Sequence, residues 1–256
     1  MLKKLFYIIT WQVKKIPKKT YAKKRFAKTT NLRNPYRYYL FEDLKQTYGV
    51  EKFNNKKILE IGPKDGEDSL RLESLKPKSI TLIELPVVKN ADHHLNKYYN
   101  EYLKPNLKKL KIEYNLIFAN FHYMSNSEYN SLGKFDLIWC TGVLYHNPEQ
   151  LRMLKKLYNL LETEGVLVLE TSTTRNNSIQ NENVVEITTN GQYHFPTKKS
   201  LNQMLYMCGF DEIIESNCFN FENYNKKAIR VAVFAKKNKT DNKKVYRDQY
   251  LYGEST

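Results

Sequence analysis

Residues 57–66 read KILEIGPKDG, an apolar run that passes into a turn containing Gly62 and Gly66. The two glycines permit a tight turn and let a ligand approach the backbone closely. Glu67 and Asp68 follow, and acidic residues are favourable in the first turn of a helix. The stretch therefore predicts a buried strand, a glycine turn and the start of a helix, a pattern typical of nucleotide-binding α/β sheets.

The rest of the chain repeats this alternation of strand and helix. Between the apolar runs the apolar side chains show helical spacing, as at Leu151, Leu154, Tyr158 and Leu161. Apolar strands separated by such helices predict an α/β fold with a mostly parallel sheet and helices on both faces. The predicted strands are residues 57–62, 79–85, 114–121, 135–141, 165–171, 211–216 and 229–235.

Two later helices have recognisable ends. Asn147 and Pro148 predict an N-cap and a first-turn proline. Thr197 predicts the N-cap of a second helix, and Gly209 its end.

A ligand of such a sheet binds at the carboxyl ends of the strands, near the point where the strand order reverses. Glu84 ends the second predicted strand, where a carboxylate can accept hydrogen bonds from both ribose hydroxyls of a nucleoside. The spacing from the glycine turn to Glu84 favours ribose binding over a chance acid at a strand end.

Five motifs in order resemble the class I S-adenosylmethionine-dependent methyltransferases, over residues 40–237. They are ILEIGPKDG (58–66), an acid at 84, Asn-Phe at 120–121, FDLIWCTGVLYHNP (135–148) and LLETEGVLVLET (160–171). GVLYH (142–146) and the segment 193–210 are similar to the lineage of tRNA wobble-uridine carboxymethyltransferases. The resemblance implies a Rossmann-like sheet of seven strands and S-adenosyl-L-methionine as the cofactor.

The resemblance also implies a set of cofactor-binding residues. Glu60 would lie under the loop near the methionine amino group, residues 62–66 would wrap the methionine moiety, and Glu84 would bind the ribose. Residues 120–121 would flank the adenine, and residues 140–142 would line the sulfonium side. The full set is Glu60, Gly62, Pro63, Lys64, Asp65, Gly66, Glu84, Leu85, Asn120, Phe121, Cys140, Thr141 and Gly142.

Tyr145 and His146 would face the methyl group and its acceptor. Methyl transfer needs chiefly an aligned donor and acceptor, and a hydroxyl acceptor reacts faster with a general base. His146 is the candidate base and Tyr145 would orient the acceptor; alternatively, His146 only hydrogen-bonds the start of the following helix. Cys140 is expected to be a small wall residue, since nothing nearby indicates a thiolate mechanism. His194 is expected to pack or lie at the surface, with a reach into the acceptor pocket as the alternative.

Lys64 departs from the family pattern, which usually has a third glycine at this position. A lysine predicts an ordinary backbone conformation there, and it places a cation beside a cationic sulfonium. The carboxymethyl relatives bind a carboxylated cofactor with basic residues, and the arginine that follows their Tyr-His pair is Asn147 here. Plain methyl transfer is therefore expected.

The charge divides the chain unevenly. The formal net charge is +15, and residues 1–41 hold twelve Lys and Arg with no acid, so the remainder is nearly balanced. We therefore expect a basic arm over residues 1–41, a methyltransferase domain over 42–237 and a polar tail over 238–256. The pI describes the arm and not the fold.

Leu2, Phe6, Ile9, Val13 and Ile16 form a helical stripe that Pro17 should end. One hypothesis is that residues 1–16 lie on an anionic membrane, which indicates a glycan, lipid or other small-molecule acceptor. A second is that the arm binds RNA such as tRNA, because basic residues alternate with aromatic ones suited to base stacking. A third is that the stripe packs on the domain as a helical cap. The aromatic residues concerned are Tyr21, Phe26, Tyr36, Tyr38 and Tyr39.

Composition excludes several classes. The three cysteines are far apart, which argues against a disulfide framework and favours a reducing cytosol. No metal site is expected, since the adjacent His93 and His94 point in different directions on a helix. No run reaches the roughly 18 apolar residues of a membrane span, so the expected location is cytoplasmic, at the inner membrane surface if the arm binds lipid. The open alternatives are a nicotinamide dehydrogenase and a cofactor-binding module without activity; the oligomeric state is not indicated.

Overall fold

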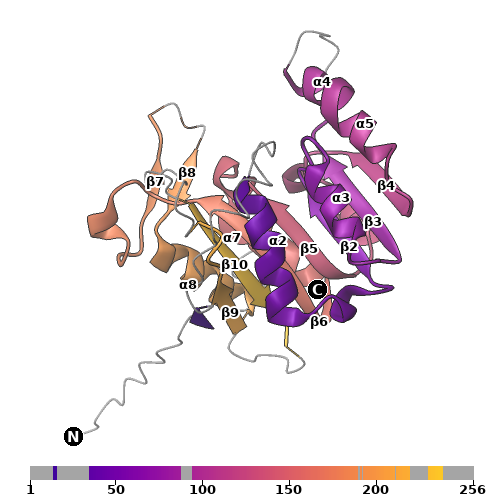
Figure 1. The fold of residues 1–256 in the computed structure, drawn as a ribbon. Coiled ribbons are helices and arrows are strands. Elements are labelled where there is room, and N and C mark those ends of the chain that lie inside the picture. The colour runs from indigo at the N-terminus through magenta and orange to yellow at the C-terminus, as the bar shows by residue number, and fades with distance from the viewer. Residues whose placement is uncertain are drawn as a thin grey trace, which may run out of the picture.

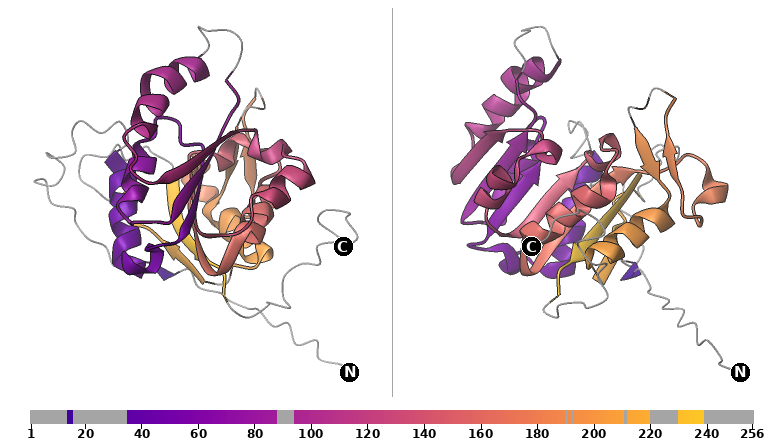
Figure 2. Two further views of the ribbon diagram at one scale, coloured as in Figure 1. Left: turned by 90° about the vertical axis from the view of Figure 1, so that its right-hand side faces the viewer. Right: turned by 180° about the vertical axis from the view of Figure 1, so that it is seen from behind.

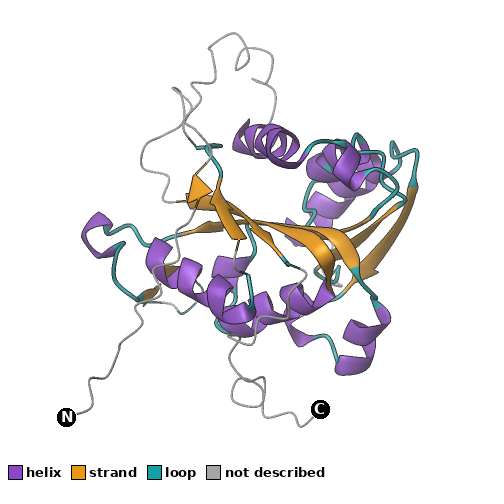
Figure 3. Cartoon of the chain, turned by 90° about the horizontal axis from the view of Figure 1, so that it is seen from below, coloured by secondary structure: helices purple, strands orange, loops and turns teal. Residues whose placement is uncertain are grey.

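The computed structural model describes residues 14–15, 35–87, 94–189, 191, 193–210, 212–219 and 230–238. A twisted sheet runs through the centre of this part of the chain, and helices cover both of its faces (Figures 1 and 3). The predicted α/β fold is thus confirmed.

The sheet contains all seven predicted strands and one more at an edge. The spatial order is β1-β9-β10-β6-β5-β2-β3-β4, and every pairing is parallel except those that β10 makes with β6 and β9. Strands β7 and β8 form a separate hairpin that was not predicted. The strands are β1 (Lys14–Lys15), β2 (Lys57–Ile61), β3 (Ser79–Glu84), β4 (Glu113–Phe118), β5 (Phe135–Thr141), β6 (Leu161–Ser172), β7 (Val185–Ile187), β8 (His194–Pro196), β9 (Glu212–Glu215) and β10 (Arg230–Lys236).

The strand order reverses between β2 and β5. The chain runs from β2 outward to β3 and β4, then returns to β5 on the other side of β2. A crevice forms at the carboxyl ends of the strands at such a point, because the connections leave in opposite directions.

Two sets of helices bury the two faces of the sheet. Side chains of α2, α3 and the segment from α4 to α5 share a core with Trp139 and Val168, and those of α7 and α8 share one with Ile138 and Leu169. Segment α4 and the β7–β8 hairpin project on either side of the sheet (Figures 1 and 2). The helices are α2 (Pro35–Tyr48), α3 (Glu67–Glu73), α4 (His94–Tyr98), the π-helix η2 (Tyr99–Leu103), α5 (Lys104–Leu107), α6 (Asn126–Ser131), α7 (Gln150–Leu160) and α8 (Lys198–Cys208), with 3-10 turns η1 (Glu51–Phe53), η3 (Phe121–Tyr123), η4 (Leu144–His146) and η5 (Asn177–Ile179).

The predicted domain boundary at residue 41 is wrong. Helix α2 crosses it, and Tyr39 and Leu40 are fully buried against the sheet. The aromatic residues of this stretch belong to the apolar face of the helix, which their basic neighbours concealed. Tyr36 and Tyr39 are buried, so these two aromatic residues do not lie on the surface of a separate arm.

The predicted helix over residues 2–16 is also wrong at residues 14–15, which are the part of it that the structure describes. Lys14 and Lys15 form strand β1, which pairs in parallel with Ile214 and Glu215 of β9. The other residues of this stretch lie outside the described residues, as do Tyr21 and Phe26 and the tail from residue 239.

The helix ends were predicted with mixed success. Thr197 caps α8 by accepting from the Ser200 N–H, and Gly209 ends it in a left-handed conformation, as expected. Helix α7 begins at Gln150, later than the expected start at Pro148. Asn147 instead follows turn η4, and its Oδ1 accepts from the Glu149 N–H at 2.8 Å.

Within the described ranges, none of the helices combines the length and apolar character required to cross a bilayer.

Candidate functional site

A cleft of about 740 Å³ opens at the carboxyl ends of the central strands, where the strand order reverses. Ten of the predicted site residues line it: Gly62, Lys64, Glu84, Leu85, Asn120, Phe121, Thr141, Gly142, Tyr145 and His146. Glu60, Pro63, Asp65, Gly66 and Cys140 are not among its lining residues. Most of the predicted site residues therefore line the cleft, although other residues make up more than half of its lining.

The turn after β2 requires glycine at its start. Gly62 has φ +70°, and a Cβ on it would stand 2.8 Å from Cγ2 of Val143. Gly66 has φ +77° and is the N-cap of α3. Any side chain at residue 62 would fill the narrow space between the turn and Val143 beside the cleft.

The prediction of an ordinary backbone for Lys64 is wrong. Lys64 has φ +54°, in the left-handed region that costs a non-glycine residue about 1–2 kcal/mol. Its N–H donates to Oε2 of Glu84 at 2.8 Å, which holds the turn in this shape. Its Nζ lies 5.0 Å from the centroid of the Tyr98 ring, so the cation faces the aromatic wall of the cleft.

Glu84 presents a carboxylate fixed by two backbone donors. Oε2 accepts from Lys64 and Oε1 from the Leu85 N–H at 2.7 Å. Burial raises the pKa of Glu84, while these two donors oppose the rise. Each oxygen keeps a second acceptor position, so the carboxylate can still bind a pair of ligand hydroxyls.

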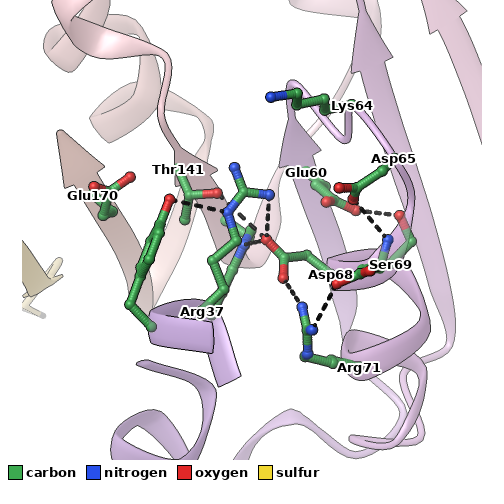
Figure 4. A network of polar contacts seen from close by, with 12 residues as sticks. Arg37, Glu60, Lys64, Asp65, Asp68, Ser69, Arg71, Thr141 and Glu170 are labelled. Atoms are coloured by element: carbon green, nitrogen blue, oxygen red, sulfur yellow. Dashed lines mark hydrogen bonds and ion pairs between the residues drawn. The ribbon is translucent and has the colours of Figure 1, made fainter. Parts of the chain in front are cut away.

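A buried polar network lies beneath the turn (Figure 4). Asp68 lies between Arg37 and Arg71, accepts from Arg37 Nη1 at 3.0 Å, and also accepts from the Trp139 indole at 3.0 Å. Glu60 accepts from Ser69 Oγ at 2.6 Å. Burial raises the pKa of Glu60 to about 8, helped by the negative charge of Asp68. The network supports the turn from below, and it explains why Glu60 does not line the cleft.

Two arginines that the motifs did not indicate reach the cleft from opposite ends of the chain. Arg230, the first residue of β10, binds the fully buried Glu170 with Nε and Nη2. Arg37 comes from α2, and its Nε donates to Tyr36 at 3.4 Å. A Cβ on Gly142 would stand 3.5 Å from Nη2 of each arginine. The guanidinium groups thus converge at the end of β5.

Tyr145 and His146 lie beside an aromatic group from the hairpin. The Tyr145 ring centroid is 4.2 Å from that of His146, 5.9 Å from Tyr193 and 6.1 Å from Phe195. Partial burial lowers the pKa of His146, and the positive charges of Arg230 and Lys64 lower it further. His146 is therefore neutral at pH 7 and able to accept a proton.

His122 is a second imidazole in the cleft, but its nitrogens are occupied. Nε2 lies 2.6 Å from Glu149 Oε2, and Nδ1 lies 3.0 Å from the amide nitrogen of Asn147. The amide nitrogen of Asn147 can only donate, so His122 accepts at Nδ1 and donates at Nε2. This arrangement leaves His146 as the better base.

The opposite wall comes from the segment between β3 and β4. Leu95, Tyr98, Tyr99 and Leu103 line the cleft from α4 and the π-helix. A π-helical turn is often found at functional sites, and sequence periodicity does not reveal it. Asn106 Nδ2 donates to the Asp65 carbonyl at 2.8 Å and ties this wall to the glycine turn.

Comparison with known proteins identifies the family. A model of the methyltransferase domain family matches residues 33–215. The chain therefore belongs to this methyltransferase domain family, as the motifs predicted.

Among curated proteins, the chain is 27% identical to a tRNA U34 carboxymethyltransferase of Wolinella succinogenes over 168 residues, which cover 62% of this chain and 53% of that protein. It is 32% identical over 117 residues to the tRNA U34 carboxymethyltransferase of Nautilia profundicola, covering 46% of this chain and 34% of the relative. The chain thus matches about half the length of the first relative and a third of the second.

Solved structures share the fold at low identity. The N-terminal domain of EvdMO1 with S-adenosylhomocysteine bound has a TM-score of 0.55 and 19% identity, over 78% of this chain and 81% of that one. The 1,6-didemethyltoxoflavin-N1-methyltransferase of Burkholderia thailandensis, with its substrate and S-adenosylhomocysteine, has a TM-score of 0.57 and 12% identity over 84% and 83%. These likenesses confirm the class I methyltransferase fold.

Proposed function

We propose that the protein is an S-adenosyl-L-methionine-dependent methyltransferase that transfers a methyl group to an oxygen or nitrogen atom of an acceptor. The observation that carries this proposal is the pair formed by the glycine turn and Glu84 at one cleft. Gly62 leaves room where a side chain would collide with Val143, and the Glu84 carboxylate is fixed with acceptor positions to spare. This arrangement fits the methionine and ribose parts of the cofactor.

Some residues of the cleft would bind the cofactor, and others would orient and deprotonate the acceptor. Glu84 would hold the ribose, and Phe121 and Asn120 would flank the adenine. S-adenosyl-L-methionine would supply an electrophilic methyl group on its sulfonium. Tyr145 would orient the acceptor, and His146, kept neutral by its surroundings, would take the proton from a hydroxyl acceptor.

Cofactor binding is tested by titration calorimetry with S-adenosyl-L-methionine and S-adenosylhomocysteine. Glu84→Gln should weaken the binding of both ligands by at least about tenfold, because a charge-assisted hydrogen bond contributes about 1.5–3 kcal/mol. Asp136→Asn is the matched control, since Asp136 also accepts a backbone N–H, from Lys57 at 3.0 Å, but at the other end of the sheet. Absence of binding to the wild-type chain at millimolar ligand would refute the proposal.

Carboxymethyl transfer is a second candidate, favoured by the two arginines at Gly142. Arg37 and Arg230 supply the basic groups that were expected after His146 and are missing there. The names of the curated relatives agree with this candidate. Parallel titrations with S-adenosyl-L-methionine and its carboxylated form decide between the two candidates, since the tighter ligand identifies the transferred group.

The acceptor is proposed to be a small molecule, glycan or lipid, with tRNA as the alternative. The membrane hypothesis rests on residues 1–16, and the burial of Tyr36 and Tyr39 weakens the tRNA alternative. Flotation with anionic vesicles, comparing the full chain with one beginning at Asn31, tests membrane contact while keeping α2 intact. Equal recovery of both chains in the unbound fraction would contradict the membrane hypothesis.

A further inference from the structure

Lys64 brings a positive charge to the cofactor cleft without an ion-pair partner among the described residues. The two arginines that line the cleft differ in this respect. Arg37 pairs with the buried Asp68 at 3.0 Å. Arg230 pairs with the buried Glu170. Figure 4 shows the Lys64 side chain above the buried network and not joined to it. A cleft that is proposed to bind a cationic sulfonium is therefore lined by a cation that forms no ion pair.

The ammonium group of Lys64 faces the ring of Tyr98. Nζ lies 5.0 Å from the ring centroid, which is within the range of a cation–π contact, and both residues line the cleft. The negative face of an aromatic ring attracts a cation but does not neutralise it. The contact therefore holds the charge of Lys64 at the wall of the cleft.

The wall that carries Tyr98 is fixed against the glycine turn. Asn106 Nδ2 donates to the Asp65 carbonyl at 2.8 Å, and a Cβ on Gly66 would stand 3.1 Å from Cβ of Asn106. Asn106 belongs to α5, which continues α4 and the π-helix η2 without a break. Because Lys64 lies within the same turn, the fold itself positions the ammonium relative to the Tyr98 ring.

The charge of Lys64 acts on both ends of the proposed cofactor site. At the ribose end, burial raises the pKa of Glu84, and the charge of Lys64 is among the influences that oppose the rise. At the acceptor end, burial lowers the pKa of His146, and the charges of Arg230 and Lys64 lower it further. A cofactor whose ribose binds Glu84 and whose methyl group faces His146 has its sulfonium between these ends. The sulfonium would therefore lie within the electrostatic range of the ammonium.

We propose that Lys64 and Tyr98 set the preference of the cleft between the cationic cofactor and its neutral product. The ammonium of Lys64 disfavours the sulfonium of S-adenosyl-L-methionine, whereas the sulfur of S-adenosylhomocysteine carries no charge. Tyr98 is a positioning residue, because it holds the ammonium at the wall and so limits this repulsion. The inference rests on the proposed function, since it concerns the two forms of the proposed cofactor.

The chemistry of methyl transfer gives this repulsion a use. The bond between sulfur and the methyl carbon breaks, its electron pair stays on sulfur, and the methyl carbon bonds to the acceptor atom. The positive charge on sulfur is lost in this step, so the repulsion by Lys64 is relieved as the reaction proceeds. An unfavourable interaction that is weaker in the transition state than in the bound cofactor raises kcat.

Titration calorimetry of the full chain with S-adenosyl-L-methionine and S-adenosylhomocysteine tests the inference. The quantity compared is the ratio of the two dissociation constants. Lys64→Met removes the charge and should shift this ratio in favour of S-adenosyl-L-methionine by at least about threefold. Tyr98→Leu releases the ammonium from the wall and should shift the ratio toward S-adenosylhomocysteine by at least about threefold. The double variant should match Lys64→Met, because Tyr98 acts through the lysine.

Tyr98→Phe and Lys97→Met are the matched controls. Phenylalanine keeps the ring face that the ammonium contacts. The Lys97 side chain is 65% exposed, lies 4.0 Å from Glu101 and does not line the cleft. Both variants should therefore keep the wild-type ratio. Sinefungin, which has an amine-bearing carbon in place of the methylated sulfur, should follow S-adenosyl-L-methionine in every variant because it is also a cation at this position.

The outcomes separate the inference from the proposed function. An unchanged ratio in Lys64→Met would overturn the inference, even if both ligands bind more weakly. Any result for Tyr98→Leu other than a shift toward S-adenosylhomocysteine, or a shift that persists in the double variant, would also overturn it. Failure of the wild-type chain to bind either ligand would instead refute the proposed function, and the inference would fall with it.

Discussion

Lys64 donates its backbone N–H to Oε2 of Glu84 while holding a left-handed backbone conformation. The bond joins the turn after β2 to the end of β3. One hydrogen bond therefore fixes both the shape of the turn and the orientation of the Glu84 carboxylate. The strained backbone of Lys64 is what points its N–H at this carboxylate.

Replacing Lys64 by glycine should stabilise the protein. Lys64→Gly removes the left-handed strain and should raise the free energy of unfolding by about 1 kcal/mol, measured by urea denaturation. Lys76→Gly is the control, since Lys76 also has φ +54° but is exposed away from the cleft. Both should gain stability, and only Lys64→Gly should alter cofactor affinity. A loss of stability in Lys64→Gly would show that the cation–π contact with Tyr98 outweighs the strain.

Arg37 should be essential to the stability of the fold. Arg37→Met leaves the buried Asp68 with one fewer positive partner, and breaking a buried pair costs about 3–5 kcal/mol. Arg71 and Trp139 still bind Asp68, so a value near the lower limit is expected. Arg152→Met, which removes an exposed pair at 3.8 Å, should cost under about 1 kcal/mol. Equal effects of the two changes would contradict this account.

Activity on a hydroxyl acceptor should follow the ionisation of His146. A base must be neutral, and the lowered pKa of His146 keeps it neutral to a more acidic pH, so the midpoint of the acid-side fall in kcat should lie below the ordinary histidine pKa of 6.5. Lys64→Gln removes one of the charges that lower this pKa and should move the midpoint upward. His146→Gln should reduce kcat by about 10²–10⁴-fold without that pH dependence. An unchanged pH profile in Lys64→Gln would argue against His146 as the base.

The free energy of unfolding should fall as the pH rises, because Glu60 loses its proton in the folded protein. Its folded-state pKa of about 8 lies above the ordinary value of 4.5, so the folded protein holds a proton that the unfolded chain releases between these values. The stabilisation is complete below pH 4.5 and is lost as the pH rises through 8. Glu60→Gln should flatten this dependence, as read from urea midpoints between pH 5 and 9. A parallel decline in both proteins would place the titrating group elsewhere.

Local patterns were enough to predict the sheet and the part of the cleft that lies at the strand ends. The strands are short apolar runs bounded by turns. Gly62 and Gly142 directly follow two of them and Glu84 ends a third, and all three residues line the cleft. Arg37 and Arg230 could not be found in this way, because they meet only through the three-dimensional order of α2 and β10.

The predictions for the arm boundary at residue 41 and for the backbone of Lys64 were wrong for the same physical reason: both depend on contacts between distant segments of the chain. Residues 36–41 hold four aromatic side chains and follow a strongly basic stretch, and only contact with the sheet shows that these aromatic side chains pack into the core. The left-handed Lys64 likewise depends on its bond to Glu84, twenty residues away along the chain. Neither partner can be inferred from the spacing of nearby residues.

The convergence of Arg37 and Arg230 on Gly142 has a consequence for biosynthesis. The first arginine emerges early during translation, whereas the second lies in the last strand of the sheet. A nascent chain that already contains the glycine turn and Glu84 still lacks Arg230. Glu170 then has no arginine to bind. A chain that ends before β10 therefore lacks Arg230, the guanidinium that faces Gly142 from this strand, and the partner of Glu170.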